Sequence, residues 1–263
     1  PMDYRTTLGS HALVIGASTT IGEQFARQLA QKGMNVVLVA RRQEELERVA
    51  SDIRREHRVE ARVVALDLMV DGAVDKLVAA VSDLEISLLV VNANLHKVNL
   101  FDKMDLDTKL RMIRMNTELP VRLVHTLGPP MLERGRGGVI LISSLNCLSP
   151  LEIDSVFQGT KAFILLFGES LWAEYRRRGV KVAVTLVNGI EGSESYEKKL
   201  SPRSRKVAKL IGGSMPPERI VASSLEQLER DYPALVPDFV VPINRTAVQP
   251  GLPLRMAKSR ALT

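Results

Sequence analysis

Short apolar runs alternate with longer amphipathic segments along most of this chain. The runs have the length and continuous apolar character of strands buried on both faces, and they occupy residues 11–15, 35–40, 61–67, 86–94 with its exit turn, 138–144 and 180–187. A further run at 239–244 suits an edge strand, because it contains Pro242. Apolar residues recur at helical spacing over 23–30, 43–56, 105–134 and 162–178, and another helix is expected to start within 216–218.

This alternation predicts one doubly wound α/β domain in three layers, with a mostly parallel sheet of about seven strands and helices on both faces. A length of 263 residues suits a single large domain. We expect an N-terminal extension at 1–9, the main domain at 10–245 and a basic tail at 246–263. Within the domain, the polar and serine-rich stretch 191–215 is predicted to be a mobile segment that covers the substrate.

The composition indicates a reducing compartment. The chain has 45% hydrophobic and 25% charged residues, as folded soluble proteins do, and a single cysteine, Cys147, which rules out an intrachain disulfide. No run reaches the roughly 18 apolar residues of a membrane span, and residues 1–5 do not resemble a secretory signal. We therefore expect a cytoplasmic protein.

The charge is basic, with a formal net charge of +6. Much of the excess lies at 176–178, at 198–209 and in the tail 246–263. Basic chains bind nucleic acid, anionic membrane surfaces or small polyanions. Aromatic residues are only 4% and no nucleic-acid-binding motif is present, so nucleic acid is not the expected partner. The tail suits a short amphipathic helix, for which a membrane-surface or dimer contact is compatible and a packed or frayed end is favoured.

A glycine-bearing turn joins the first strand to the first long helix. It runs from Gly16 to Gly22 as Gly-Ala-Ser-Thr-Thr-Ile-Gly. Glycine lets the backbone approach a pyrophosphate, and the helix N-terminus supplies N–H groups and a positive dipole end. The turn is typical of a dinucleotide-binding unit, although a plain strand-to-helix turn uses glycine too.

Two arginines, Arg41 and Arg42, follow the second strand. In a dinucleotide-binding fold this strand end faces the adenosine ribose, where arginine accommodates a 2′-phosphate and an acidic residue would bind the 2′-hydroxyl. The first acidic residue after the strand is Glu44. The pair therefore predicts the phosphorylated cofactor, unless it is only a solvated basic pair at a strand end.

The strongest chemical signal surrounds the end of the fifth strand. Ser144 ends that strand, Phe157 follows thirteen positions later, and Lys161 lies four residues further on the same helix face. The short-chain dehydrogenase/reductase family has a serine, a tyrosine and a lysine at this spacing. The chain resembles that family over about residues 10–245, and its 3-oxoacyl and hydroxysteroid reductases most of all. It carries phenylalanine where the family has its tyrosine.

The resemblance implies binding of NADP(H) along the carboxyl ends of the strands. The residues expected to contact the cofactor are Gly16, Ser18, Thr19, Thr20, Ile21, Gly22, Arg41, Arg42, Asp67, Leu68, Asn92, Ala93, Asn94, Lys161, Asn188, Gly189 and Ser193. Among them, Asp67 would meet the adenine amino group, although its place in the sequence suits a helix N-cap equally well. Ser193 would bind the nicotinamide carboxamide.

Several positions depart from the family pattern. Thr20 replaces the middle glycine of the turn and adds a Cβ where backbone and phosphate come close. Asn94 replaces a glycine that lies against the cofactor, a milder change because asparagine tolerates left-handed backbone. Asn188 replaces a proline, and Cys147 stands where glycine is frequent, more typical of a small buried hydrophobe than of a nucleophile.

The resemblance also implies roles in carbonyl reduction. Ser144 would hold the substrate oxygen, Lys161 would bind the nicotinamide ribose and lower the tyrosine pKa, and Asn116 would kink its helix and hold a relay water. Asn116 is equally compatible with a polar residue satisfied locally. Phe157 has no proton to give, and loss of a positioned general acid costs on the order of 10²- to 10⁴-fold in rate.

Three interpretations of this site remain. Another group donates the proton, with Cys147, Tyr196 or a water held by Asn116 and Lys161 as candidates. Alternatively the fold serves non-redox work, as a ligand-binding or partner subunit. Alternatively Phe157 is an engineered replacement of tyrosine. The additional departures favour natural drift of the site, since a single engineered change would not produce them.

The remaining expectations concern substrate, assembly and metal. By resemblance, the substrate is an apolar carbonyl compound or alcohol. The helices 105–134 and 162–178 have apolar faces wider than one sheet surface needs, which predicts a homodimer or homotetramer. The histidines at 11, 57, 96 and 125 show no metal-ligand spacing and suit structural or surface roles, although His96 lies near the expected cleft. No Gly-x-Ser-x-Gly elbow indicates a serine hydrolase.

Overall fold

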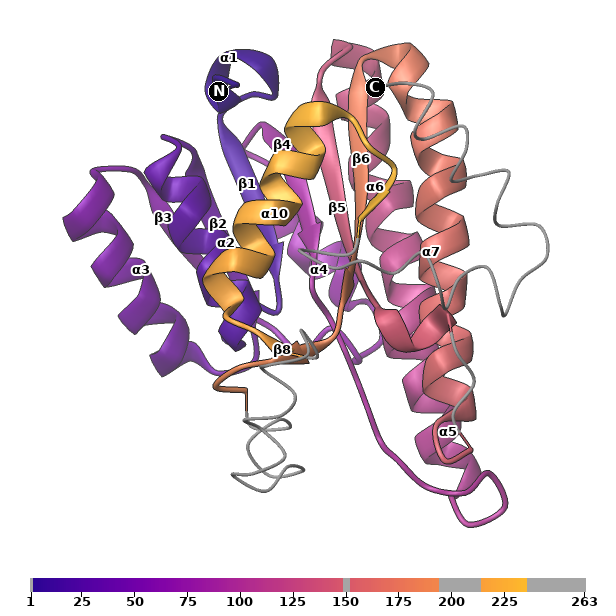
Figure 1. Ribbon diagram of the computed structural model, residues 1–263. Helices are drawn as coiled ribbons and strands as arrows, with labels where there is room; N and C mark the ends of the chain where they lie inside the picture. The colour runs from indigo at the N-terminus through magenta and orange to yellow at the C-terminus, as the bar shows by residue number, and fades with distance from the viewer. Residues whose placement is uncertain (1, 149–151, 194–213, 236–263) are drawn as a thin grey trace.

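A seven-stranded parallel sheet forms the centre of the protein (Figure 1). The computed structural model describes residues 2–148, 152–193 and 214–235. The sheet order is β3-β2-β1-β4-β5-β6-β9. Its strands are β1 His11–Ile15, β2 Asn35–Ala40, β3 Ala61–Ala65, β4 Ile86–Val91, β5 Gly137–Ser144, β6 Val180–Val187 and β9 Ala234–Leu235. The predicted doubly wound sheet is therefore confirmed.

Helices cover both faces of this sheet. The helices are α1 Tyr4–Thr7, α2 Thr20–Gln31, α3 Gln43–His57, α4 Ala73–Ala80, α5 Leu106–Ile113, α6 Leu119–Arg134, α7 Ser155–Tyr175 and α10 Pro217–Arg230. One core cluster joins one sheet face to α2, α3 and α10, and a second joins the opposite face to α4, α6 and α7. The three layers are visible in Figure 1.

Alternation along each strand decides which core a side chain enters. In β2, Val36 and Leu38 belong to the core under α2 and α3, whereas Val37 and Val39 belong to the core under α4 and α6. Successive side chains of a strand point to opposite faces, so a strand between two helix layers must be apolar at every position. This explains why these strands appear in the sequence as continuous apolar runs.

Two helices differ from their predicted extent. The expected helix 105–134 is interrupted by a π-helical turn over Arg114–Glu118, which contains Asn116. The helix expected at 162–178 begins earlier, at Ser155, and therefore includes both Phe157 and Lys161. This agrees with the spacing that put Phe157 and Lys161 on one helix face, although Gln158, Gly159 and Thr160 interrupt the apolar pattern.

The sheet ends at a short strand beyond β6. This strand is the two-residue β9, at Ala234–Leu235, and the predicted edge strand at 239–244 lies outside the described residues. A separate two-stranded pair joins β7 Gly189–Ile190 to β8 Ser214–Met215. Most of the predicted covering segment 191–215, with Tyr196, and the tail 246–263 also lie outside the described residues.

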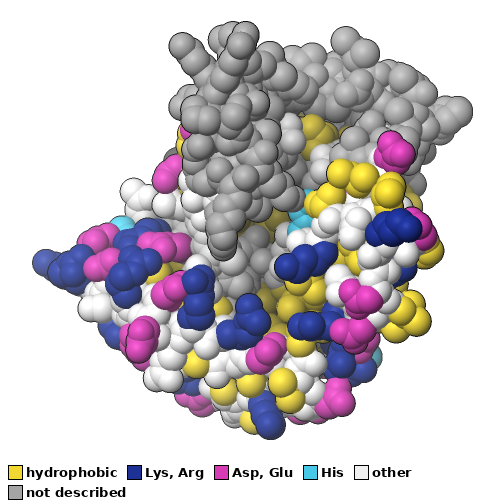
Figure 2. All heavy atoms as spheres, turned by 90° about the horizontal axis from the view of Figure 1, so that it is seen from below, with side chains coloured by type: hydrophobic (Ala, Val, Ile, Leu, Met, Phe, Trp, Pro, Cys, Tyr) yellow, Lys and Arg dark blue, Asp and Glu magenta, His cyan; other side chains and the backbone are white. Residues whose placement is uncertain are grey.

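The topology sets the position of the functional edge. All strands are parallel, and the order reverses between β1 and β4, the strands on either side of the switch point. In open α/β sheets, ligands bind outside the carboxyl ends of the strands at this point. Figure 2 views the molecule from that side and shows basic side chains spread across the face among acidic ones.

Candidate active site

The turn between β1 and α2 is shaped by its two glycines. Gly16 has a φ of +75°. A Cβ on Gly22 would lie 2.1 Å from the carbonyl oxygen of Gly16, so no larger residue fits without movement. Thr19 caps α2 by accepting a hydrogen bond from the Gly22 N–H at 3.1 Å. The turn thus brings the helix N-terminus against the strand end, the geometry that a pyrophosphate requires.

Asn92, after β4, fastens this turn to the centre of the sheet. Its side-chain amide donates to the Thr19 hydroxyl oxygen at 2.7 Å. Thr20 is the first residue of α2 and is partly exposed, whereas Ile21 is buried in the core. The Thr20 Cβ is therefore accommodated by the protein itself. Whether it also leaves room for a phosphate is tested by cofactor binding.

The arginines lie directly beside the turn. Arg42 donates to the carbonyl oxygen of Ser18 at 2.9 Å and forms an ion pair with Glu45. Arg41, the residue that follows β2, is exposed. Two guanidinium groups therefore stand where the ribose end of a dinucleotide would reach, and this donor set fits a 2′-phosphate.

Asp67 is not a helix N-cap, which was the alternative prediction for it. Its carboxylate accepts from the Met69 N–H at 3.0 Å in the turn after β3, and the N-cap of the next helix is Gly72. The helix starts six residues after Asp67, at Ala73, because the intervening turn ends in a glycine of left-handed conformation. Leu68 packs against the core beneath α4. Contact of Asp67 with adenine stays a prediction.

Asn94 corrects a second expectation. Among the described residues, the non-glycine residues with positive φ are Arg58 and Asp231, so Asn94 does not use the left-handed tolerance attributed to it. The backbone at Asn94 therefore does not adopt the left-handed conformation that favours glycine. The substitution changes only what the side chain presents to the site.

The expected nicotinamide end follows β6. Asn188 is exposed, and Gly189 opens β7. The Ser193 hydroxyl donates to the Ile190 carbonyl oxygen at 2.8 Å within a tight turn. The pairing of β7 with β8 fixes where this segment leaves the sheet. The hydroxyl is thus held at the edge predicted for it, and its contact with a carboxamide stays a prediction.

Lys161 is buried behind Phe157. The lysine is 3% exposed and donates to the Ile142 carbonyl oxygen at 3.1 Å, while its Nζ lies 5.5 Å from the centre of the Phe157 ring. Burial lowers the pKa of Lys161 to about 8, and the nearby Cys147 opposes the shift. The ring and the amine therefore lie close together, and the ring carries no hydroxyl.

Two adjacent serines divide the roles at the end of β5. Ser143 is buried and donates to the Lys161 carbonyl oxygen at 2.7 Å, which fixes α7 against the strand. Ser144 is half-buried, and its hydroxyl oxygen accepts from the Asn146 N–H at 3.2 Å. The Ser144 hydroxyl proton remains to be donated to a substrate oxygen. The structure therefore supports Ser144, instead of Ser143, as the substrate-holding serine.

Asn116 is fully engaged in structure. Its side-chain oxygen accepts from the Leu95 N–H at 2.8 Å, and its amide donates to the Leu95 carbonyl oxygen at 2.9 Å and to the Thr160 hydroxyl at 3.2 Å. The helix has a π-helical turn around it, over Arg114–Glu118. Asn116 thus partly fits both predictions made for it. The helix around it departs from regular α-helix, and its side chain is satisfied by local hydrogen bonds. Its principal effect is to hold the segment after β4 against α7.

His96 and Asp154 are two site residues that the sequence alone did not assign. The His96 ring stacks on the Phe157 ring, with 3.9 Å between centroids and 23° between planes. Its Nε2 lies 3.0 Å from the buried Asp154 carboxylate. The available signal was that His96 lies five residues after the carboxyl end of β4 and that Asp154 lies three residues before Phe157.

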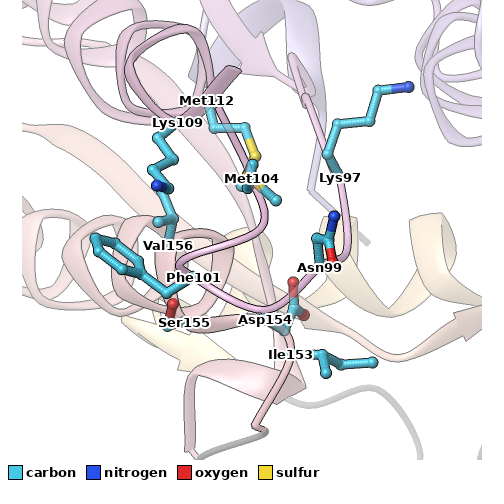
Figure 3. Close-up of a pocket in the computed structure, with 10 residues that line it drawn as sticks. All are labelled: Lys97, Asn99, Phe101, Met104, Lys109, Met112, Ile153, Asp154, Ser155 and Val156. Carbon is cyan, nitrogen blue, oxygen red and sulfur yellow. The ribbon is translucent and has the colours of Figure 1, made fainter. Parts of the chain in front are cut away.

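A small hollow lies next to this pair (Figure 3). It has an empty volume of about 180 Å³ between the segment after β4, α5 and the start of α7. Its lining residues are Lys97, Asn99, Phe101, Met104, Lys109, Met112, Ile153, Asp154, Ser155 and Val156. Its lining mixes apolar side chains with three charged ones, Lys97, Lys109 and Asp154.

The buried lysine makes stability depend on pH. The pKa of Lys161 is about 8 in the folded protein and 10.5 when solvated, so between these values the unfolded chain binds more protons and stability rises with pH. Relative to Lys161→Met, the natural protein should gain about 3 kcal/mol between pH 7 and pH 10.5. Denaturant unfolding across this range measures the gain.

The matched control for this measurement is Lys76→Met, because Lys76 is exposed on α4. It should leave the pH dependence of unfolding unchanged. A Lys161→Met profile parallel to that of the natural protein would show that the lysine is solvated in the folded state.

Comparison with known proteins identifies the family. The family model for short chain dehydrogenases matches residues 10–201. The human very-long-chain 3-oxoacyl-CoA reductase is 33% identical over 183 residues, which are 68% of this chain and 59% of that protein. A 7beta-hydroxysteroid dehydrogenase from Clostridium sardiniense is 30% identical over 231 residues, covering 88% of this chain and 87% of its own length. The chain thus spans about three fifths of the reductase and most of the dehydrogenase.

Solved structures agree with this assignment. A structure from a study of 7beta-hydroxysteroid dehydrogenase stereoselectivity superposes with a TM-score of 0.84 at 27% identity, over 94% of this chain and 93% of that one. A short-chain dehydrogenase from Sphingobium yanoikuyae has the same fold, with a TM-score of 0.81 at 24% identity. The chain belongs to the short-chain dehydrogenase family. That Phe157 stands at the position of the family's tyrosine stays a prediction from the sequence spacing.

Proposed function

We propose that this protein is an NADP(H)-dependent oxidoreductase that interconverts an apolar carbonyl compound and its alcohol, in a site without the tyrosine acid. The observation that carries the proposal is the retained group around Phe157. Ser144 stands at the end of β5, Lys161 is buried behind the ring, and Asn116 holds the neighbouring segment. A protein that had lost all use for carbonyl chemistry would have no need of this group.

The bound cofactor would supply the hydride. The turn Gly16–Gly22 would hold its pyrophosphate, Arg41 and Arg42 its 2′-phosphate, and Lys161 its nicotinamide ribose. Ser144 would donate a hydrogen bond to the substrate oxygen, and so polarise the carbonyl bond and fix its orientation.

The relatives support an apolar substrate. One matched protein is named as a reductase of very-long-chain 3-oxoacyl-CoA and another as a dehydrogenase of a 7β-hydroxysteroid. Both substrate classes present a carbonyl or hydroxyl group on a large apolar body. We propose this shared chemistry for the present chain, without choosing between the two classes.

Cofactor content tests the proposal directly. Native mass spectrometry of the purified protein, followed by fluorescence titration with NADPH, should reveal one bound NADP(H) per chain. Failure to bind either nicotinamide dinucleotide would refute the oxidoreductase function. It would favour the second candidate, a non-redox ligand-binding or partner subunit, for which Phe157 is the specific supporting observation because it has no proton to donate.

Assembly is a separate expectation. Several apolar side chains on neighbouring helices are exposed: Leu106, Leu110 and Ile113 on α5, and Phe163 and Leu166 on α7. Figure 2 shows hydrophobic side chains gathered on the side of the molecule where Figure 1 has α5. Patches of this kind mark protein interfaces, and we propose a homodimer or homotetramer through this surface.

Sedimentation velocity at micromolar concentration should therefore show a dimer or tetramer, and Leu110→Asp should yield a monomer. Val70→Asp is the matched control, because Val70 is also exposed but follows β3, and it should leave the assembly intact. A monodisperse monomer of the natural protein would contradict the proposed interface.

In the part of the chain that the structure describes, no helix is both long and apolar enough to cross a bilayer.

A further inference from the structure

The site lacks a tyrosine hydroxyl, but an imidazole lies against the ring that replaces it. Phe157 is 5% exposed, while the His96 side chain is 22% exposed. Of the two stacked rings, His96 is therefore the one that solvent and a substrate can reach. The Lys161 Nζ also lies near this ring, 5.5 Å from the Phe157 centroid.

The partner of His96 is a carboxylate with no other evident duty. Asp154 is the N-cap residue of α7, yet its side chain makes no capping hydrogen bond. Capping is the ordinary use of aspartate at this position. Asp154 instead places Oδ1 3.0 Å from Nε2 of His96, and it is only 5% exposed. A buried carboxylate is costly unless it is paired, so this ion pair is a fixed part of the site.

The backbone beside His96 is fixed too. The adjacent residue, Leu95, is held through both its N–H and its carbonyl oxygen by the side chain of Asn116. Asn116 is in turn bonded to Thr160, one residue before Lys161 on α7. The imidazole is thus held in place from both sides, by its carboxylate partner and by its own strand exit, as a proton-transfer group needs to be.

We propose that His96 is the general acid of this site, in place of the missing tyrosine, and that Asp154 positions it. The inference rests on the proposed reductase function. Because the carboxylate accepts from Nε2, Nδ1 of the imidazolium delivers the proton. As the carbonyl carbon takes the hydride that NADPH supplies, the carbonyl oxygen takes this proton; C=O becomes CH–OH, NADPH becomes NADP⁺, and the neutral imidazole regains a proton from water.

A double-mutant cycle tests this role. The measured quantity is kcat for NADPH oxidation with cyclohexanone, acetophenone and 2-decalone. His96→Asn should lower kcat by about 10²-fold or more in the natural protein, the usual contribution of a positioned acid. In the Phe157→Tyr background the tyrosine hydroxyl would donate the proton instead. There His96→Asn should lower kcat by less than about threefold. Equal losses in both backgrounds would mean that His96 only packs on the ring, and would overturn the proposal.

The control histidine is His57, at the end of α3. The neighbouring Arg54 donates to the carbonyl oxygen of Ala61 at the start of β3, which places this helix end at the opposite edge of the sheet. His57→Asn should leave kcat unchanged in both backgrounds. A loss equal to that of His96→Asn would show that the effect is not specific to the site.

The pH profile separates chemistry from structure for Asp154. The titratable groups around the stack are Asp154 beside His96, and Lys161 beside Phe157 with Cys147 near enough to affect that lysine. The rate of the natural protein should fall as pH rises through the titration of His96. Asp154→Asn removes the charge that favours the imidazolium, so the fall should move to lower pH. An unshifted profile would assign Asp154 a structural role alone.

The outcomes also distinguish this proposal from the reductase function itself. Turnover by Phe157→Tyr with none by the natural protein would leave the function standing and overturn His96 as the acid. Absence of turnover and of NADPH binding in both proteins would overturn the function, and the His96 role with it.

Discussion

Replacing Phe157 with tyrosine is expected to raise NADPH oxidation at least tenfold at pH 8. The new hydroxyl would stand on a ring whose centre lies 5.5 Å from the Lys161 amine. There it would add a proton donor to the group formed by Ser144, Lys161 and Asn116. A tenfold gain corresponds to about 1.4 kcal/mol of barrier, well inside the 3–5 kcal/mol that a positioned acid provides.

The matched control is Phe163→Tyr, the same substitution on the exposed face of the same helix. It should leave the rate unchanged. No gain from Phe157→Tyr, despite bound NADPH, would point to non-redox work at this site. A natural protein that already equals the variant at pH 8 would show that another acid fully replaces the tyrosine.

Removing the Arg41 guanidinium is expected to weaken NADPH binding by tenfold or more and to leave NADH binding unchanged. A hydrogen bond to a charged group contributes about 1.5–3 kcal/mol, and only NADPH carries the 2′-phosphate that would accept it. Fluorescence titration of Arg41→Ala with both cofactors measures the difference. The natural protein should bind NADPH well ahead of NADH.

Arg42→Ala should behave differently from Arg41→Ala. Arg42 also donates to the Ser18 carbonyl oxygen in the phosphate turn, so its loss should weaken the binding of both cofactors. Arg48→Ala is the control, because Arg48 lies further along α3 and is paired with Glu23. Equal affinity of the natural protein for NADPH and NADH would contradict the ribose argument.

The proposed role of His96 and the predicted effect of Phe157→Tyr concern the same step, the donation of a proton to the substrate oxygen. Stacking puts the imidazole on the same ring that would carry the hydroxyl, so the two donors would serve one substrate oxygen. Loss of the tyrosine and recruitment of the histidine would then be a single change of proton donor at a preserved site. The double-mutant cycle measures that exchange.

The sequence by itself determined the sheet and the phosphate turn. A strand between two helix layers is apolar at most positions, so β1, β2 and β6 have the bounds that their largely apolar runs predicted. Gly16 and Gly22 were identifiable because a tight turn admits no Cβ there. The spacing of Ser144, Phe157 and Lys161 likewise follows from a strand end and one helix face.

Only the tertiary structure decided what surrounds Phe157. His96 and Asp154 are 58 positions apart, and nothing in either local pattern links them. They meet because β4 and α7 bring their ends to the same edge of the sheet, and because Asn116 holds the strand exit against α7. Local periodicity reports which face of an element is buried, but a contact between two loops depends on packing among distant elements, which a pattern of apolar residues does not encode.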